Sequence, residues 1–149
     1  MANGRGSIVW VEGDRYEGTW VADSREGHGV YLWADATKYE GQWSRDKING
    51  KGSIVWANGN SYTGEWIDNV RTGKGTYRWK NGDVYTGVFA GNKRNGQGTY
   101  RWINGTEFSG LWQNGLMHGR GKITYRDGKI VRGTFRMNEL VEVDTSGTQ

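Results

Sequence analysis

Aromatic and apolar side chains recur along this chain at a fixed interval of 23 residues. The stretch from Tyr62 to Trp66 has an aromatic residue at each end and a glycine in the middle, and it has counterparts beginning at residues 16, 39, 85, 108 and 131. A Gly-x-Gly pair keeps the same interval, beginning at residues 4, 27, 50, 73, 96 and 119. A fixed period of this length indicates a repeat architecture. We therefore divide the chain into a lead-in (1–3), six repeats (4–26, 27–49, 50–72, 73–95, 96–118 and 119–141) and a tail (142–149).

Each repeat reads as one β-hairpin when its positions are counted from the first glycine. The large side chains fall at positions 5, 7, 13 and 17, and this period-two alternation predicts strands with one ring-bearing face. Turn signals such as Asn58-Gly59 lie between them, at positions 9 and 10. A three-residue loop over positions 8–10 keeps all these side chains on one face, with the residue at position 10 in the left-handed conformation. Ala36 breaks the glycine pattern there and should strain or reshape its turn.

The expected fold is all-β: an elongated, single-layer, twisted antiparallel sheet of six tandem 23-residue β-hairpin repeats. The glycines at positions 1, 3 and 15 share the parity of the rings, so each is expected to lie beneath a Trp or Tyr ring. Leu140 to Val143 should either add an edge strand or cover the last hairpin, and Asp144 to Gln149 is expected to be mobile. The chain starts at a repeat boundary, which suits a short whole protein and an excised fragment equally.

The pattern GxGxxxW followed by NGxxYxGxW, repeated every 23 residues over residues 4–135, resembles the MORN repeat (membrane occupation and recognition nexus). Departures occur at Ala36, Tyr125 and Val131. The resemblance implies an elongated twisted sheet of antiparallel hairpins. It also implies an accessory or scaffold protein, since members occur in radial spokes, parasite cytoskeletons and membrane junctions, and are appended to lipid kinases and a protein methyltransferase.

Composition narrows the chemistry. The chain has 26 Gly, nine Trp and eight Tyr, so a few large rings must supply most of the buried area. It has no Cys, and its only two histidines, His28 and His118, are far apart, so no disulfide, metal site, cofactor site or catalytic constellation is expected and the protein is not expected to be an enzyme. The absence of a long apolar run and of a signal-peptide core favours a cytoplasmic protein, associated with cytoskeleton or membrane.

The repeated rings are first of all structural, because they must support a sheet that has no second layer. A ring face left uncovered is also a groove for a partner. Rings interleaved with Arg and Lys can bind single-stranded nucleic acid. Here the rings occupy structural positions in every repeat, which argues against nucleic acid as the partner. The candidate partner-binding residues of the aromatic face are Trp10, Trp33, Trp56, Trp79, Trp102, Tyr16, Tyr39, Tyr62 and Tyr85.

The junctions between repeats, positions 18–23 together with position 2, form a long edge rich in Lys and Arg. This edge carries eleven basic and five acidic side chains, a net charge of +6 on a chain whose total is +4. These side chains are expected to point to solvent, where they either solubilise the protein or attract an acidic partner. The candidate residues for an anionic partner or lipid are Arg5, Arg25, Lys47, Lys51, Arg71, Lys74, Lys93, Arg94 and Arg120.

The favoured function is a non-enzymatic scaffold or adaptor for protein–protein interactions, in a cytoskeletal or ciliary assembly. Its partner would be a peptide or helix in the groove, or an acidic protein surface. One alternative is a peripheral membrane module that binds anionic phospholipid through the basic edge. Another is a regulatory repeat domain of a larger lipid kinase, and a homodimer through the chain ends is a further option.

Overall fold

The computed structural model describes residues 3–144, and in that range the chain forms thirteen strands and no helix. The strands make one open antiparallel sheet in which each strand pairs only with its neighbours in sequence. Their bounds are β1 (Gly4–Val9), β2 (Arg15–Val21), β3 (Ser24–Leu32), β4 (Lys38–Ser44), β5 (Lys47–Val55), β6 (Ser61–Ile67), β7 (Val70–Arg78), β8 (Val84–Ala90), β9 (Lys93–Arg101), β10 (Glu107–Gln113), β11 (Leu116–Thr124), β12 (Ile130–Arg136) and β13 (Glu139–Val143).

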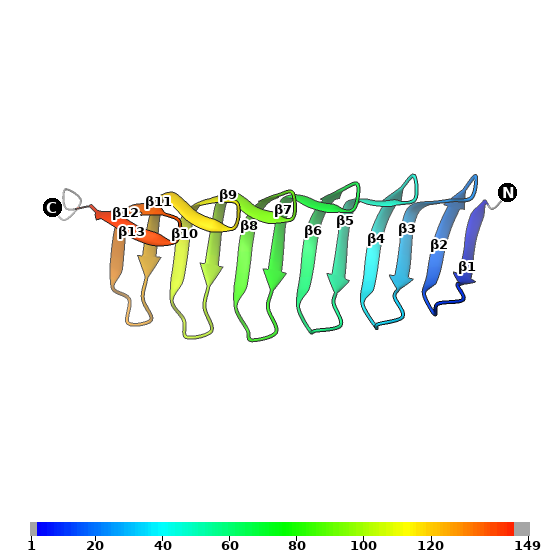
Figure 1. Cartoon of the computed structure of the whole chain (residues 1–149), viewed down its shortest axis with the longest axis horizontal. Helices are drawn as coiled ribbons and strands as arrows, with labels where there is room; N and C mark the ends of the chain where they lie inside the picture. The colour runs from blue at the N-terminus through cyan, green and yellow to red at the C-terminus, as the bar shows by residue number, and fades with distance from the viewer. Residues whose placement is uncertain (1–2, 145–149) are drawn as a thin grey trace.

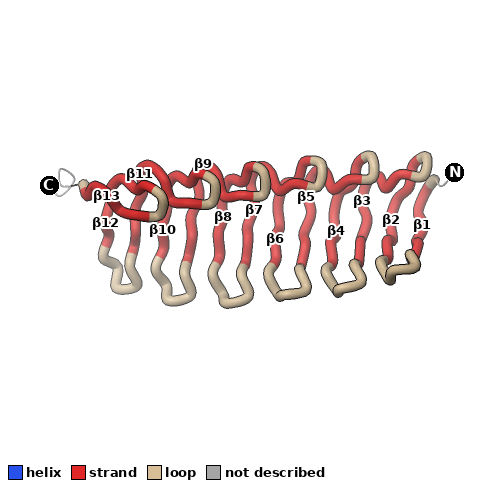
Figure 2. The backbone as a smooth tube through the Cα atoms, in the orientation of Figure 1, coloured by secondary structure: helices blue, strands red, loops and turns tan. Residues whose placement is uncertain are grey.

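The sheet is a long twisted ribbon with the strands running across its length and the two termini at opposite ends (Figure 1). Six hairpin loops follow one long edge, and the short turns that join successive repeats follow the other (Figure 2). The predicted all-β architecture of tandem hairpins is therefore confirmed.

The hairpin loops have the predicted length. In the third repeat Trp56 N–H donates to Asn60 C=O at 2.9 Å, which leaves three residues in the loop, and Gly59 at position 10 has φ +96°. This is a type I turn followed by a left-handed residue. Ala36 adopts φ +81° and its turn keeps the same two hydrogen bonds, Trp33 N to Thr37 O and Ala36 N to Trp33 O. The second hairpin is thus strained at Ala36 but not reshaped.

The turns between repeats are two-residue hairpin turns at positions 19 and 20, with both residues at positive φ. Asp68 and Asn69, for example, have φ 47° and 71°. This is the type I′ pattern, which Asn, Asp and Gly tolerate best, and position 20 is Asp, Asn or Gly in every repeat.

The core is a single layer of rings packed over glycines. Tyr62 is 0% exposed and lies above Gly64 of its own repeat and Gly75 of the next, where a Cβ atom would come within 2.7 Å of its hydroxyl or closer. Tyr62 also meets Trp66 and Phe89 edge to face, at centroid distances of 5.2 and 5.1 Å. The same contacts repeat from Tyr16 to Phe135, so an unbroken edge-to-face chain of rings joins all six repeats. The prediction that rings lie above the glycines at positions 3 and 15 is confirmed.

The glycine at position 1 has a different function from the one expected. Gly73 has φ +98°, and its nearest neighbour is Glu65 on the face away from the rings. It belongs to a register shift between β6 and β7, where Gly64 pairs with Gly75 but Trp66 pairs with Arg71. Such a bulge favours a residue that accepts positive φ. Every junction of this kind carries the shift, and the prediction that position 1 lies beneath a ring is wrong.

The ends of the sheet differ from the internal repeats. Leu140 to Val143 belongs to β13, an edge strand paired with β12, which was one of the two arrangements expected. The expected mobility of Asp144 to Gln149 and the lead-in at residues 1–3 fall mostly outside the described residues.

Candidate functional site

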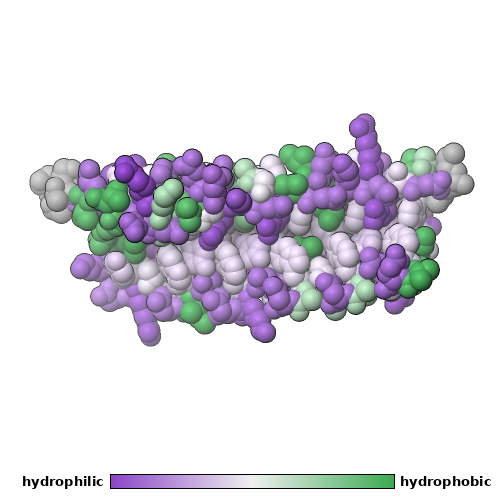
Figure 3. All heavy atoms as spheres, viewed as in Figure 1, coloured by the Kyte–Doolittle hydropathy of each residue, from purple (hydrophilic) through white to green (hydrophobic). Residues whose placement is uncertain are grey.

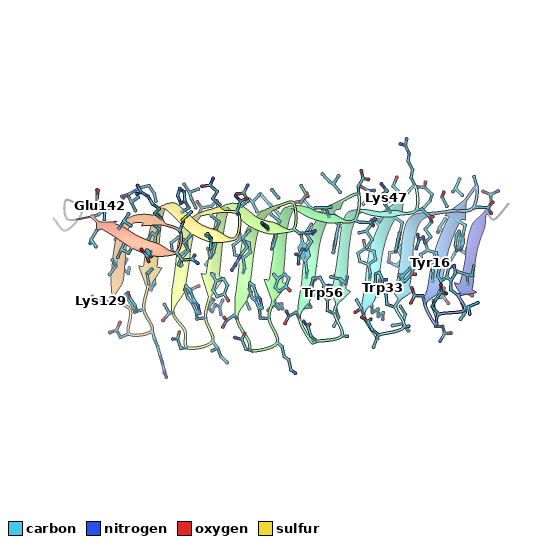
Figure 4. All side chains as sticks on the ribbon, viewed as in Figure 1. Tyr16, Trp33, Lys47, Trp56, Lys129 and Glu142 are labelled. Carbon is cyan, nitrogen blue, oxygen red and sulfur yellow. The ribbon has the colours of Figure 1, made fainter. Side chains whose placement is uncertain are left out.

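A second set of rings lies beside the core rings on the same face of the sheet and packs against them. It consists of the position-7 indoles and the position-5 side chains, and Figure 4 shows Trp33 and Trp56 on successive hairpins. Centroid distances of 5.4, 4.5, 5.0 and 4.7 Å connect Trp56, Tyr77, Trp79, Tyr100 and Trp102 in one continuous run. These indoles are partly buried against the core and keep one side open. The five predicted tryptophans are thus placed together on one accessible face.

The four predicted tyrosines are not on that surface. Tyr16, Tyr39, Tyr62 and Tyr85 are at most 1% exposed, beneath the position-17 rings. The hydroxyl of Tyr62 donates to Glu65 C=O at 2.9 Å, and burial raises its pKa to about 12. Burial likewise raises the pKa of Tyr85 to about 12. Their assignment as partner-binding residues is therefore wrong for this structure, because a partner cannot reach side chains that fill the core.

Three of the predicted edge residues lie over the rings instead of pointing to solvent. Arg25, Arg71 and Arg94 all stand at position 22, and their guanidinium carbons lie 4.7–6.0 Å from ring centroids. The bulge explains the error: it shifts the register so that position 22 pairs with position 17 on the ring face. The glycine at position 1 was the feature of the sequence that could have indicated this bulge.

Position 20 of the following repeat holds each of these arginines, through its side chain for Arg25 and Arg71 and through its backbone carbonyl for Arg94. The Asp46 carboxylate accepts hydrogen bonds from Arg25 N at 2.9 Å and Arg25 Nε at 2.7 Å. Two repeats further along the chain, Asn92 Oδ1 accepts a hydrogen bond from Arg71 N at 2.8 Å, and Arg71 Nη2 donates to Asn92 C=O at 2.8 Å. The position-20 residue of each repeat thus anchors the position-22 residue of the preceding one.

Rings and arginines together line an aromatic groove, which we define as the ring face bounded by positions 7 and 22. It comprises three hollows that share boundary residues. The first, of about 650 Å³, runs from β1 to Arg25, and the second, of about 490 Å³, runs from Arg25 to Arg71. The third, of about 210 Å³, lies between Arg71 and Arg94. Figure 3 shows a pale band of intermediate hydropathy along the ribbon between hydrophilic margins.

The remaining basic residues are exposed, and two of them border the groove: Arg5 lines the first hollow and Lys93 lines the third. Arg5, Lys47, Lys51, Lys74 and Lys93 are exposed, and Lys47 projects at the junction edge (Figure 4). Lys51 and Lys74 line a hollow with the hydroxyl residues of the face opposite the rings. Arg120 is exposed and forms an ion pair with Asp144. The predicted basic edge is therefore divided between the groove, the junction turns and the opposite face.

Sequence reasoning missed the part played by position 11. The carboxylate of Asp83 is 7% exposed and accepts hydrogen bonds from Tyr100 Oη at 2.7 Å and from Ile103 N at 3.0 Å. Asp14 binds Tyr31 and Ala34 of the next repeat in the same way. These carboxylates position the groove tyrosines, and each has ordinary structural partners.

Residues 3–144 contain neither a candidate metal site nor a candidate membrane-spanning helix. That part of the chain contains no group of three or more His, Cys, Asp or Glu side chains placed to hold a metal ion. It also contains no helix long and apolar enough to cross a membrane.

Comparison with known proteins gives one family and a set of similar folds. A family model described as MORN repeat matches five consecutive segments, residues 16–38, 39–61, 62–84, 85–107 and 108–130. A search of the curated proteins found no match.

Among solved structures, the chain is similar to the TCP domain of Drosophila melanogaster SAS-4 (dCPAP) in complex with a proline-rich motif of Ana2 (dSTIL). The identity is 15% and the TM-score 0.56, over 88% of this chain and 72% of that one. It is also similar to the TCP10 domain of Danio rerio CPAP in complex with a peptide of STIL, with 11% identity and a TM-score of 0.48, over 90% of this chain and 81% of that one.

Proposed function

The chain belongs to the MORN repeat family, and on that premise we propose that it is a non-enzymatic scaffold that holds a segment of a partner protein in its aromatic groove. The observation that carries this proposal is the continuous run of half-buried rings from Trp56 to Trp102. Rings with one open side offer large apolar contact area at little cost in side-chain entropy, because the core already holds them.

The groove suits an extended segment. Its ring-bearing hairpins repeat every two strands, about 10 Å, so successive indoles contact residues about three apart in an extended chain. Proline-rich segments dock in aromatic-lined grooves because they are already extended before binding. The Drosophila SAS-4 structure, a complex with a proline-rich motif of Ana2, supports the proposal by showing a peptide held by a protein of similar fold.

The setting that we propose is the cytoplasm, in a cytoskeletal or ciliary assembly, by analogy with other members of the family. Anionic phospholipid binding is the second candidate, favoured by the exposed Lys47, Lys51, Lys74 and Lys93. It is weakened because Arg25, Arg71 and Arg94, three of the nine basic residues assigned to it, lie over the rings.

Nuclear magnetic resonance of the indole N–H groups tests groove binding within one spectrum. Phage-displayed random dodecapeptides are selected on the chain, and a selected peptide is added to ¹⁵N-labelled protein. We expect shifts of the Trp33, Trp56 and Trp79 signals, because these rings line the groove.

The core indole of Trp112 is the internal control. Its Nε1–H donates to Gly98 C=O at 3.1 Å and its ring lines none of the three hollows, so its signal should move little. If no peptide is recovered, or if the peptide shifts only backbone signals of the opposite face, the groove is not the binding site.

A further inference from the structure

The three groove arginines occupy equivalent positions but have unequal partners. Position 20 of the following repeat supplies a carboxylate to Arg25, an amide to Arg71 and no side chain to Arg94, because the residues there are Asp46, Asn92 and Gly115. The backbone turn is the same in each case, so the difference lies in the side chain at position 20.

Arg25 is neutralised within the protein. Its Nε lies 2.7 Å from Asp46 Oδ1, and its Nη2 donates to Asp46 C=O at 3.0 Å. Asp46 also lines the first and second hollows. Arg5 and Asp23 line the first hollow as well, so in this half of the groove a charged residue of a partner meets arginines accompanied by carboxylates.

Among residues 3–144, no carboxylate forms an ion pair with Arg71 or Arg94. Arg94 Nη2 donates to Gly115 C=O at 2.9 Å, and Arg71 bonds only the amide and carbonyl oxygens of Asn92. The third hollow is lined by Arg71, Lys93 and Arg94 together with aromatic and uncharged residues, and no Asp or Glu of the described chain is among them. Both carboxylate oxygens of Asp83, the acidic group at the far end of Tyr100, already accept hydrogen bonds.

The arginines are also partly removed from water. Arg94 lies over Trp79, Tyr100 and Trp112 at 5.4, 5.5 and 4.8 Å, and burial lowers its pKa from the ordinary value. Ring contacts offset part of the cost of burying a cation, and an opposite charge offsets much more. A guanidinium in this environment, with N–H groups left over, is prepared for an anion.

We propose that the third hollow binds the carboxylate of an Asp or Glu side chain in the partner segment that lies in the groove. This inference rests on the proposed function and adds a direction to it. Asp46 and the paired Arg25 mark one half of the groove and the unpaired Arg71 and Arg94 mark the other, so a bound segment is oriented with its acidic residue over β7 to β11 (Figure 1).

The first test compares charge variants with the selected dodecapeptides. We expect Asp and Glu to be enriched in peptides recovered on the wild-type chain. By fluorescence polarisation, Arg71→Gln with Arg94→Gln should weaken a labelled acidic peptide by about tenfold or more, because a desolvated charge pair is lost. The matched control, Arg78→Gln with Lys122→Gln, removes the same net charge from outside the groove and should change affinity by less than about twofold.

The second test places a carboxylate of the protein itself beside each of the two arginines. Asn92→Asp and Gly115→Asp copy the arrangement of Asp46 beside Arg25, and the backbone tolerates them because position 20 already holds Asp at φ 68° in two repeats. A Cβ on Gly115 would have Arg94 Nη2 at 3.8 Å as its nearest neighbour. This double variant should fold with unchanged or higher stability and bind the acidic peptide about tenfold less tightly.

The outcomes separate this inference from the proposed function. Peptides that shift the groove indoles but carry no acidic residue, or that bind the Arg71→Gln, Arg94→Gln variant unchanged, would overturn the carboxylate site and leave the groove as a binding surface. Vesicles of phosphatidylcholine with 30% phosphatidylserine provide the lipid comparison, and we expect no co-sedimentation of the chain that depends on Arg71 and Arg94. If the chain co-sediments through these arginines while acidic peptides fail to bind, the anion is a lipid headgroup and the inference is wrong.

Discussion

Replacing Gly75 by Ala tests the packing of rings over glycine. A Cβ at Gly75 would lie 2.5 Å from Tyr62 Cζ, whereas carbon atoms in contact are about 3.5–4.0 Å apart. The ring therefore has to move by about 1 Å. It has no free direction, because it is 0% exposed, is held between Trp66 and Phe89 and donates to Glu65 C=O at 2.9 Å.

The expected net cost is about 2 kcal/mol. Overpacking costs about 1–3 kcal/mol and a weakened hydrogen bond about 0.5–1.5 kcal/mol. Lower chain entropy of the unfolded state returns about 0.4–1 kcal/mol when glycine becomes alanine. The assay is urea unfolding followed by tryptophan fluorescence, with circular dichroism to confirm that the sheet persists.

Gly6 provides the matched control, because it occupies position 3 of the first repeat and has no described repeat before it to supply a ring. Its added Cβ would meet only Trp20, at an ordinary 3.7 Å, so Gly6→Ala should be neutral or slightly stabilising. In a Tyr62→Ala background the cost of Gly75→Ala should largely disappear. Equal effects at Gly6 and Gly75, or additivity with Tyr62→Ala, would refute the account.

Two further predictions concern ionisation and backbone strain. Burial raises the pKa of Tyr62 and Tyr85 from 10.0 to about 12, so the unfolded chain loses these protons before the folded chain does. The free energy of unfolding should therefore be at its full value below pH 10 and fall between pH 10 and pH 12. A urea midpoint that stays constant to pH 11.5 would contradict this. Ala36→Gly should raise the free energy of unfolding by about 1 kcal/mol, because alanine is strained at φ +81°, while Gly59→Ala should lower it by a similar amount at φ +96°; thermal melting of both variants checks the sign.

Much of the fold is predictable because it depends on local parity. Glycine at position 10 and rings at odd positions allow only a loop of odd length, and Gly59 with Trp56 adopts the predicted geometry. The ring-over-glycine contact is also local, since Tyr62 covers a glycine two residues further along its own strand. These features need only the alternation of a strand and the sizes of the side chains.

The composition of the site was less predictable, because it depends on contacts between repeats. Arg71 reaches the groove through a register shift that Asn92 of the next repeat helps to hold, and simple alternation places position 22 on the opposite face. Likewise, Tyr62 is buried because Phe89, 27 residues away, closes over it. The stacking of successive hairpins decides which rings are buried and which rings lie over them. The repeat consensus does not distinguish the two kinds of ring.

The crosswise course of the strands has a mechanical consequence. Each strand is bonded only to its neighbours in sequence, so the hydrogen bonds between successive strands carry tension along the ribbon in series, and one strand pair can open while the others hold. One repeat occupies about 10 Å of ribbon when folded and about 80 Å when its 23 residues are drawn out. Under load the chain is therefore a link that lengthens in steps of one hairpin, while the repeats still folded keep their portion of the groove.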